Sequence, residues 1–382
     1  RTAIVHDQMW LSHREAAAAV ASAASAADQP TVGATVDAAS AAVEATGIAS
    51  TLDVASTASA VEAGMAASEA EPETEAAVLP AASCTDRREE CGQWAASGEC
   101  SANAPFMETS CPSSCGLCAG RDALCVDRPA ASLATDTAAQ RQAVRVYATH
   151  GAVCFPAVLP PGAVSALLAH IGVLEGRTDL VDNTAVKRLD SHETARRINK
   201  AVPLADEATS AVLRAALAAL APLMRRLLGC CDPPLLESAM LLSYPGASAQ
   251  NFHSDTSVHE PHVAHMMKVQ VVLTDTVAQM GPLQVKPDTQ RSGNRSAHPV
   301  HLALPAGSVI LYDTRVHHRA GANTLRRRPV YYFSLKGPGV TPTGMRYAIQ
   351  PEDIGTWRVS DFVQHTPAEG DEATCSRHAA WC

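Results

Sequence analysis

The most informative residues of this chain are Gln250-Asn-Phe-His253-Ser-Asp255, followed later by Asp313-Thr-Arg-Val-His317-His318-Arg319. Two imidazoles and one carboxylate form the ligand set that holds Fe(II) with open coordination positions. In a strand, residues two positions apart point the same way, so His253 and Asp255 can contact one metal ion together. The third ligand has to come from a strand distant in sequence. His318 follows the apolar, strand-like run 308–313 and can supply it.

Other readings of these residues exist. The Ser-Asp-Thr-Ser run at 254–257 also has the composition of a surface turn. His317 is an alternative to His318, and the two would point in opposite directions along one strand. We expect the remaining histidines to lie in loops, to be solvated or to line the substrate entrance: His259, His262, His265, His298 and His301.

Short motifs surround the histidines in a defined order. Tyr244-Pro-Gly-Ala precedes the HxD motif, and Gly281-Pro-Leu and Gly307-Ser-Val-Ile-Leu-Tyr follow it. His318-Arg-Ala-Gly-Ala-Asn-Thr and Arg328-Pro-Val-Tyr complete the series. Over residues 140–340 this order resembles the phytanoyl-CoA dioxygenase-like branch of the Fe(II)/2-oxoglutarate oxygenases. The resemblance implies a mainly β, double-stranded β-helix (jelly-roll, cupin-like) core with flanking helices.

The resemblance also implies the ligands of the cofactors. Fe(II) would be held by His253, Asp255 and His318, because the family places its last ligand immediately before Arg-x-Gly-Ala-Asn. Arg328 would bind the distal carboxylate of 2-oxoglutarate, since a guanidinium matches that group bidentately. Arg326 is the alternative to Arg328.

Asn251 and Gln250 are candidates to hydrogen-bond the other end of 2-oxoglutarate, because they directly precede the HxD motif. O2 would be the co-reactant, and the implied reaction is hydroxylation of an unactivated C–H bond. We expect no catalytic residue beyond the metal centre. The substrate stays open and could be a small molecule, a lipid or a peptide.

A second signature lies upstream, where six cysteines fall within residues 84–118. An even number of cysteines at short spacing indicates a disulfide framework. Zinc is the alternative at Cys115-x2-Cys118, although no second ligand pair accompanies it. With Trp94, Gly98-Glu-Cys and Asn103, the run is similar to the ShKT domain, which implies three bridges. These pair Cys84 with Cys118, Cys91 with Cys111, and Cys100 with Cys115.

Composition divides the chain into four expected parts. Residues 1–83 are rich in Ala and poor in large apolar side chains, which predicts a low-complexity linker, helical in part. The ShKT module at 84–118 and the dioxygenase domain at 138–340 follow. In the tail, 341–382, Cys375 and Cys382 would pair with each other or with Cys125.

Apolar periodicity predicts the elements of the dioxygenase domain. We expect helices at 138–150, after Pro161 and at 206–228, the last ended by Gly229. We expect strands at 151–158, 238–244, 267–274, 282–286, 308–313 and 329–335. The polar segments 176–203 and 256–266 are expected to set the substrate.

Charge and composition bound the partners. The net charge of −9 argues against a nucleic-acid surface. No apolar stretch is long enough to predict a transmembrane helix. The cysteine-rich module indicates an oxidising compartment, so we expect the secretory pathway, the ER lumen or the exterior, with any signal peptide upstream of Arg1. The module itself could contact a protein or a glycan.

Two rival functions remain. Prolyl 4-hydroxylases also accompany ShKT modules, but their last His is followed some ten residues later by Lys, and no Lys stands near that offset from His318. The other rival is a ShKT-type binding protein with an inert barrel. The intact His253, Asp255, His318 and Arg328 argue against inertness. The module also has no Lys, which a potassium-channel toxin would need.

Overall fold

The computed structural model describes residues 86–117, 120–184, 196–257, 264–292, 297–342 and 347–364. All described residues belong to one unit of the chain, 78–382. The expected linker at 1–83 and the tail cysteines Cys375 and Cys382 therefore lie outside the described residues.

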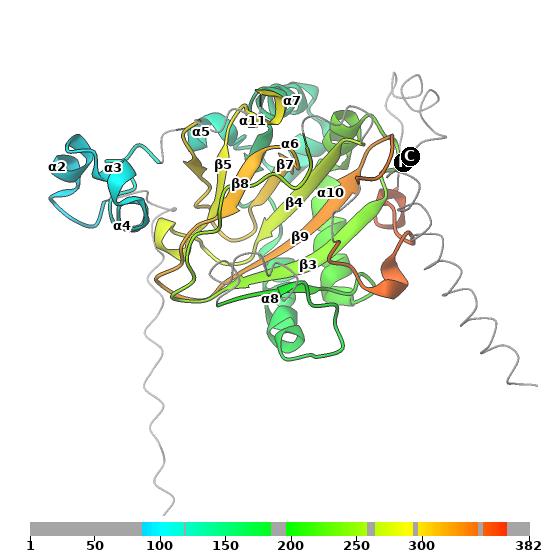
Figure 1. Cartoon of the computed structure of the whole chain (residues 1–382). Coiled ribbons are helices and arrows are strands. Elements are labelled where there is room, and N and C mark those ends of the chain that lie inside the picture. Colours follow the sequence, from blue (N-terminus) through cyan, green and yellow to red (C-terminus); the bar gives the residue numbers. More distant parts are fainter. Residues whose placement is uncertain are drawn as a thin grey trace, which may run out of the picture. The chain divides into compact units, whose positions relative to one another are not determined.

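Two antiparallel sheets form the core of the described unit (Figure 1). The larger sheet has the strand order β1-β7-β4-β9-β3-β2 and the smaller has the order β6-β5-β8. Non-consecutive strands pair in both, as a double-stranded β-helix requires, which confirms the expected jelly-roll core. The strands of the larger sheet are β1 (Ala152–Phe155), β2 (Arg197–Ala201), β3 (Leu235–Ser243), β4 (Met266–Val272), β7 (Val309–Asp313) and β9 (Arg328–Lys336). Those of the smaller are β5 (Leu283–Lys286), β6 (Val300–His301) and β8 (His317–Ala320).

The larger sheet packs one face on the main hydrophobic core, and the other face carries a polar row beside a second apolar cluster, because side chains alternate along each strand. On β9, Tyr331, Phe333 and Leu335 belong to the main hydrophobic core. The intervening residues, among them Tyr332 and Ser334, point to the other face. Strand register extends this polar row across the sheet: Lys268 lies opposite Ser334, and Gln270 lies opposite Tyr332. The functional side chains therefore gather on the face away from the main core.

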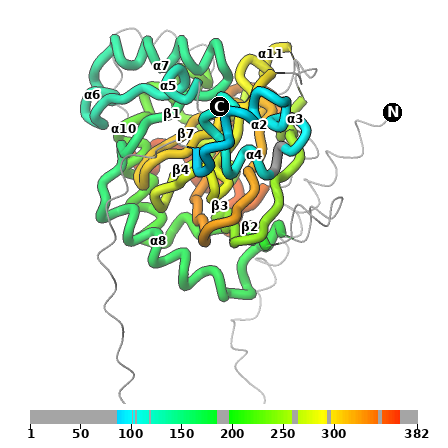
Figure 2. Tube along the Cα trace, turned by 90° about the vertical axis from the view of Figure 1, so that its left-hand side faces the viewer, coloured from blue at the N-terminus to red at the C-terminus, as the bar shows by residue number. Residues whose placement is uncertain are grey.

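Helices cover the apolar face. They are α6 (Ala130–Thr135), α7 (Thr137–His150), α8 (Pro161–Glu175) and α10 (Glu207–Leu228). On α10, Leu213, Leu217 and Leu220 recur at helical spacing and join the same core as the strands. Figure 1 shows α10 behind β3 and β9, and Figure 2 shows α8 and α10 on one side of the strands. Burial of this face stabilises the sheet that carries the site.

The predicted elements are confirmed, with additions. The helices expected at 138–150 and 206–228 begin and end within a residue of α7 and α10, and Gly229 ends α10 in a left-handed conformation. The segment 176–203, expected to be a variable polar stretch, contains β2, which extends the larger sheet. Its alternation of charged and apolar residues is too short to give a strand signal.

The cysteine-rich region forms three short helices, α2 (Cys91–Ala96), α3 (Glu99–Ala102) and α4 (Ala104–Ser110). Disulfides join Cys91 to Cys111 and Cys100 to Cys115, as the ShKT resemblance implied. The disulfide at Cys115 is incompatible with the alternative of a zinc ligand there. Cys84 and Cys118, the third expected pair, lie outside the described residues.

Cys125 corrects one expectation. It is bonded to Cys154 of β1 and not to a tail cysteine. The bond holds the segment after the short helix α5 (Arg121–Leu124) against the edge of the larger sheet. Cys230 and Cys231 are also disulfide-bonded, which agrees with the structural role expected for them.

Candidate metal centre and cosubstrate site

His253, Asp255 and His318 lie together. One ligand atom from each falls within 4.8 Å of the others. The Nε2 atom of His253 is 3.9 Å from Oδ1 of Asp255, and the Nε2 atom of His318 is 3.7 Å from Oδ2. The two imidazole rings are 4.6 Å apart between centroids. This set matches the two-His, one-carboxylate donors of a non-haem Fe(II) site.

Each imidazole is oriented by its own backbone. The Nδ1 atom of His253 donates to the carbonyl of Asn251 at 2.9 Å, and that of His318 donates to the carbonyl of Val316 at 2.9 Å. A carbonyl only accepts, so Nδ1 carries a proton in each ring, and Nε2 is the nitrogen that a metal could reach. Burial lowers the pKa of His318 to about 3, so this ring stays neutral at physiological pH. Both rings therefore turn Nε2 toward Asp255, as metal ligation requires.

The HxD motif does not lie in a regular strand, contrary to the expectation. His253 and His318 form an isolated antiparallel bridge, with the His253 amide donating to the His318 carbonyl and the reverse. After the bridge the chain turns, and the Asp255 amide donates to the carbonyl of Thr314 at 2.8 Å. The carboxylate is thus placed by a turn anchored to the segment before β8. His253 and Asp255 lie close together, as the i, i+2 argument predicted, but a turn and not strand alternation brings them there.

The other histidines divide as strand alternation requires. His317 is half-buried and lies outside the three-residue cluster, while His318 is buried. His298 is exposed, as expected. His265 lies in the loop before β4, as expected, with its Nε2 atom 3.0 Å from Oδ2 of Asp313. His301 is buried in β6, so the expectation of a loop or solvated residue is wrong there. His259 and His262 lie outside the described residues.

Arg328 begins β9 and is 1% exposed. Its Nε and one Nη atom have no hydrogen-bond partner among the described residues. Burial lowers the pKa of Arg328 to about 9, and the nearby Arg197 contributes to the shift. A buried guanidinium without an anion is costly, so the site is suited to an anionic ligand. Arg326, the alternative, is exposed and donates to the carbonyl of Asp275.

Arg197 and Ser243 complete a row across the sheet that sequence reasoning missed. Ser243 of β3 is the register partner of both Arg328 and Arg197. Its hydroxyl is buried without a hydrogen-bond partner among the described side chains. Arg197 donates to the carbonyls of Ser248 and Gly321. Two guanidinium-bearing residues and a serine therefore lie in one row across the sheet. No local pattern marked Arg197, which stands in a polar segment of the sequence.

Lys268 of β4 links the metal ligands to the interior of the sheet. Its Nζ atom is 3.0 Å from Oδ2 of Asp255 and 3.6 Å from Oε2 of Glu237. Burial by itself lowers the pKa of Lys268, but Asp255 and Glu237 outweigh it and raise the pKa well above its ordinary value. The ammonium therefore stays charged and holds the Asp255 carboxylate. Lys268 and Gln270, at alternate positions of an apolar run, were the signal that could have found it.

Tyrosines border this cluster. Lys268 Nζ lies 5.0 Å from the centroid of the Tyr332 ring, whose hydroxyl donates to Asn199 at 2.9 Å. The Tyr312 ring lies 4.8 Å from that of His318. Since Tyr332 and Arg328 are four residues apart on β9, they share one face of the strand. Arg328, Tyr332 and Lys268 therefore lie on one face of the larger sheet, and Lys268 contacts the proposed metal ligand Asp255.

Gln250 and Asn251, the candidates for the near end of 2-oxoglutarate, differ in burial. Gln250 is buried and its Oε1 accepts from the Ala320 amide at 2.9 Å, so it ties the HxD segment to β8. Asn251 is exposed, and its carbonyl orients His253. The proposed role of the Asn251 side chain stays a prediction.

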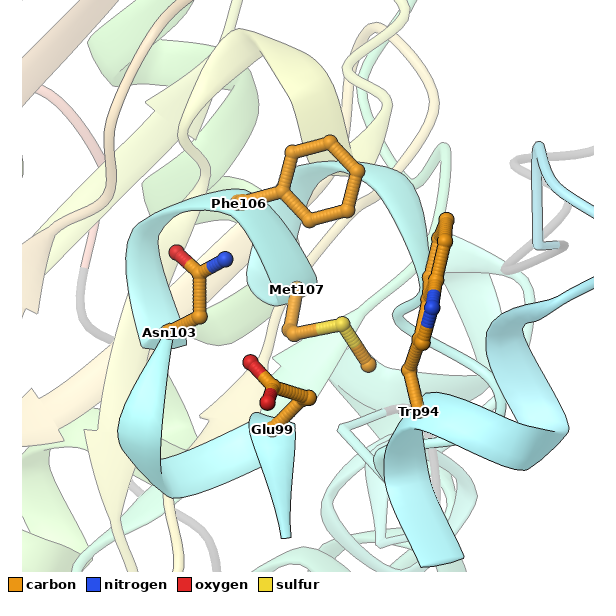
Figure 3. A pocket seen from close by; sticks show the side chains of 5 residues that line it. All are labelled: Trp94, Glu99, Asn103, Phe106 and Met107. Carbon is orange, nitrogen blue, oxygen red and sulfur yellow. The ribbon is translucent and has the colours of Figure 1, made fainter. Parts of the chain in front are cut away.

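A separate hollow lies within the cysteine-rich region (Figure 3). Met107 lies at its centre, with the rings of Trp94 and Phe106 on one side and Glu99 and Asn103 on the other. The two rings are 5.5 Å apart in an edge-to-face arrangement. None of these residues belongs to the metal cluster.

Comparison with protein families agrees with this description. Residues 147–328 match the model of phytanoyl-CoA dioxygenase (PhyH), and residues 83–118 match that of ShK-like domains. The chain therefore carries a PhyH domain at 147–328, preceded by a ShK-like domain at 83–118. No curated protein sequence matches the chain. Among the helices that the structure describes, none is both long and apolar enough to cross a bilayer.

The chain is also similar to several solved structures. One is the epimerase SnoN in complex with Fe3+, alpha ketoglutarate and nogalamycin RO, at 20% identity over 62% of this chain and 98% of that chain, with a TM-score of 0.46. Another is HygX from Streptomyces hygroscopicus with nickel and 2-oxoglutarate bound, at 17% identity over 56% and 98%, with a TM-score of 0.42. A third is EctD from S. alaskensis with 2-oxoglutarate and 5-hydroxyectoine, at 20% identity over 57% and 83%, with a TM-score of 0.41.

Proposed function

We propose that this protein is an Fe(II)- and 2-oxoglutarate-dependent dioxygenase that hydroxylates an unactivated C–H bond. One observation carries the proposal. A fully buried guanidinium without an anionic partner in the described structure, that of Arg328, lies on the same sheet face as Lys268, which contacts Asp255 in a cluster of two imidazoles and a carboxylate. The cluster suits a divalent iron and the guanidinium suits a dicarboxylate, so the two features fit one pair of cofactors.

In this proposal each side chain has a defined task. His253, Asp255 and His318 hold the iron and leave coordination positions open for cosubstrate and O2. Arg328 binds the distal carboxylate of 2-oxoglutarate. When bound, iron and 2-oxoglutarate supply the oxidising chemistry, and the protein orients and shields them.

Lys268 orients Asp255 through its 3.0 Å contact with Oδ2. Because Nδ1 of each histidine is held by a carbonyl, the rings cannot turn their protonated nitrogen toward the metal. Asn251 is proposed to contact the cosubstrate from the HxD side. The substrate class stays broad, a small molecule, a lipid or a peptide side chain.

We also propose that the protein works in the secretory pathway or outside the cell. The support is the set of disulfides Cys91–Cys111, Cys100–Cys115 and Cys125–Cys154. Disulfides persist in oxidising compartments and are rare in the cytosol. The hollow of the ShK-like domain in Figure 3 is the surface that we propose for contact with a protein or glycan partner.

The test is anaerobic titration of the folded chain with Fe(II) followed by 2-oxoglutarate. We expect a weak visible charge-transfer band that appears only when both are present. Exposure to O2 should then convert 2-oxoglutarate to succinate, slowly even without the substrate. If the folded chain binds Fe(II) and no band forms, the barrel is inert and the protein is a ShK-type binding protein.

A further inference from the structure

We propose that Glu108 of the ShK-like domain is a positioning residue for the metal centre of the barrel. Through Arg319 it would hold the two segments that carry His253 and His318. This inference rests on the proposed metal site and goes beyond it, because it makes the ShK-like domain a part of the catalytic unit. An accessory domain that only binds a partner would have no such task.

The first step is a closed set of hydrogen bonds. Glu108 lies on α4, is buried, and its Oε1 accepts from an Nη atom of Arg319 at 2.5 Å. Its Oε2 accepts from Nε2 of Gln284 at 3.2 Å, and Oε1 of Gln284 accepts from Nε of Arg319 at 2.7 Å. The three side chains therefore fix one another. Charge-assisted hydrogen bonds of this kind have a defined geometry.

The second step connects Arg319 to both imidazoles. Arg319 directly follows His318 on β8. Its guanidinium carbon lies 4.2 Å from the centroid of the Phe252 ring, and Phe252 directly precedes His253. The guanidinium of the residue that follows His318 thus contacts the residue that precedes His253. Its position affects the spacing of the two rings.

The third step is the local charge. Lys286 Nζ lies 4.5 Å from the same Phe252 ring, so two cations flank one aromatic side chain. Burial lowers the pKa of Lys286, and the charge of Arg319 lowers it further. Glu108 forms an ion pair with Arg319, one of these two cations. Without it, Arg319 would be a mostly buried cation lacking its charged partner, and it should move toward solvent and release Phe252.

The fourth step is that the domain is attached at other points too. Gln279 donates to the carbonyl of Thr109 at 2.9 Å, and the His301 amide donates to the carbonyl of Leu117 at 3.1 Å. The loss of the Glu108 charge alone should therefore leave the ShK-like domain in place. Its effect should appear at the metal centre and not in the fold.

The test uses the full chain with its disulfides intact and measures Fe(II) binding anaerobically, without cosubstrate or substrate. We expect Glu108→Gln to weaken Fe(II) binding by about tenfold, within the range found when groups that support metal ligands are removed. The affinity of the iron-loaded chain for 2-oxoglutarate should change far less, because Arg328 is untouched. The matched control is Glu89→Gln, an exposed acid of the same domain, which should change neither.

A double-mutant cycle shows whether Glu108 acts through Arg319. We expect Glu108→Gln to have no further effect on Fe(II) binding in an Arg319→Gln background. Additive effects, or a Glu108→Gln variant indistinguishable from Glu89→Gln, would overturn the inference. If Glu108→Gln does not unfold cooperatively, Glu108→Asp takes its place, with a smaller loss expected and an unchanged affinity counting against the inference. A wild-type chain that does not bind Fe(II) would instead refute the proposed function.

Discussion

At the scale of single residues, the metal centre depends on which ring nitrogen of each histidine is available. The i−2 carbonyls hold Nδ1 of His253 and of His318, so Nε2 is left for a metal. The low pKa of His318 means that no proton has to leave this ring on metal binding at neutral pH. His317, one position away, points off the cluster because side chains alternate along β8.

The first prediction concerns these ligands. His253→Ala, Asp255→Ala and His318→Ala should each abolish tight Fe(II) binding, because each removes one of three donors. His317→Ala should largely retain it. The measurement is anaerobic equilibrium dialysis with metal analysis. An equal loss in His317→Ala would show that the third ligand is misassigned.

The second prediction concerns Arg328. Arg328→Ala should weaken 2-oxoglutarate binding while Fe(II) affinity stays nearly unchanged, because the guanidinium would act at the far end of the cosubstrate. Loss of a buried charge pair costs about 2–5 kcal/mol, roughly thirty-fold to several-thousand-fold in affinity. Arg328→Lys should recover only part, since an ammonium lacks the planar fork. Arg326→Ala, at an exposed position, is the control. If Arg326→Ala weakens 2-oxoglutarate binding strongly and Arg328→Ala does not, the cosubstrate arginine is misassigned.

The third prediction concerns His301, whose two ring nitrogens are buried without a hydrogen-bond partner among the described residues. Burial, with a smaller effect of Arg319, lowers its pKa from 6.5 to about 3. His301→Leu should therefore raise the free energy of unfolding by about 1–3 kcal/mol at pH 7.5, because an unsatisfied polar group is removed.

The pH dependence of this effect has a definite sign. Between pH 6.5 and 3 the unfolded chain binds a proton that folded His301 does not, so the wild type loses stability as the pH falls. His301→Leu lacks this loss, and its advantage should grow by about 2 kcal/mol between pH 7.5 and pH 5. Urea unfolding at both pH values measures the gap. A gap that stays constant would mean that His301 is not buried in the neutral form.

At the scale of elements, the smaller sheet depends on a close approach of two backbones. Gly281, between the 3-10 turn η2 (Ala278–Met280) and β5, has φ of +64°. A Cβ added there would lie 2.3 Å from the carbonyl oxygen of Gly321 and 2.6 Å from that of Ala322. These atoms belong to the chain that leaves β8, so Gly281 sets how β8 reaches the metal centre.

The fourth prediction follows from this contact. Gly281→Ala should destabilise the fold by at least about 2 kcal/mol, from left-handed backbone strain and the collision with a carbonyl. Gly172→Ala is the matched control, because Gly172 lies inside α8 with nothing within 4 Å of an added Cβ. It should be neutral or stabilising by up to about 1 kcal/mol. Thermal unfolding of both variants checks the contrast, and equal melting temperatures would contradict it.

At the scale of the whole molecule, disulfides join parts that are distant in sequence. The Cys125–Cys154 bond spans 29 residues and closes a loop that contains α6 and α7. These helices cover the apolar face of the larger sheet. The bond therefore reduces the conformational freedom of the unfolded chain in a segment that contributes to the core. It also lies outside the ShK-like domain, so it stabilises the barrel itself.

The fifth prediction is that replacing both Cys125 and Cys154 by Ala lowers the free energy of unfolding by about 3–4 kcal/mol, the loop-closure value for a loop of this length. Urea unfolding under non-reducing conditions measures it. Fe(II) affinity of the folded variant should be retained, because neither cysteine contacts the metal cluster. A stability unchanged within error would show that the bond does not form in solution.

Local patterns in the sequence determined most of the elements and the core of the site. The long helices were predictable because their apolar residues recur about once per helical turn, as Leu213, Leu217 and Leu220 do. The three proposed metal ligands and Arg328 were predictable because they stand inside short motifs. The two disulfides Cys91–Cys111 and Cys100–Cys115 were implied by the ShKT resemblance, which the cysteine spacing made visible.

Only the tertiary structure decided which distant residues meet. Strand register brings Arg197 of β2 into one row with Ser243 and Arg328, and it places Lys268 against Asp255 and Glu237. The same holds for Glu108 beside Arg319 and for Cys125 beside Cys154. The physical reason is that a contact between residues far apart in the chain leaves no periodicity in either segment. Such a pair becomes visible only when the strands are paired and the polar face of the sheet is assembled.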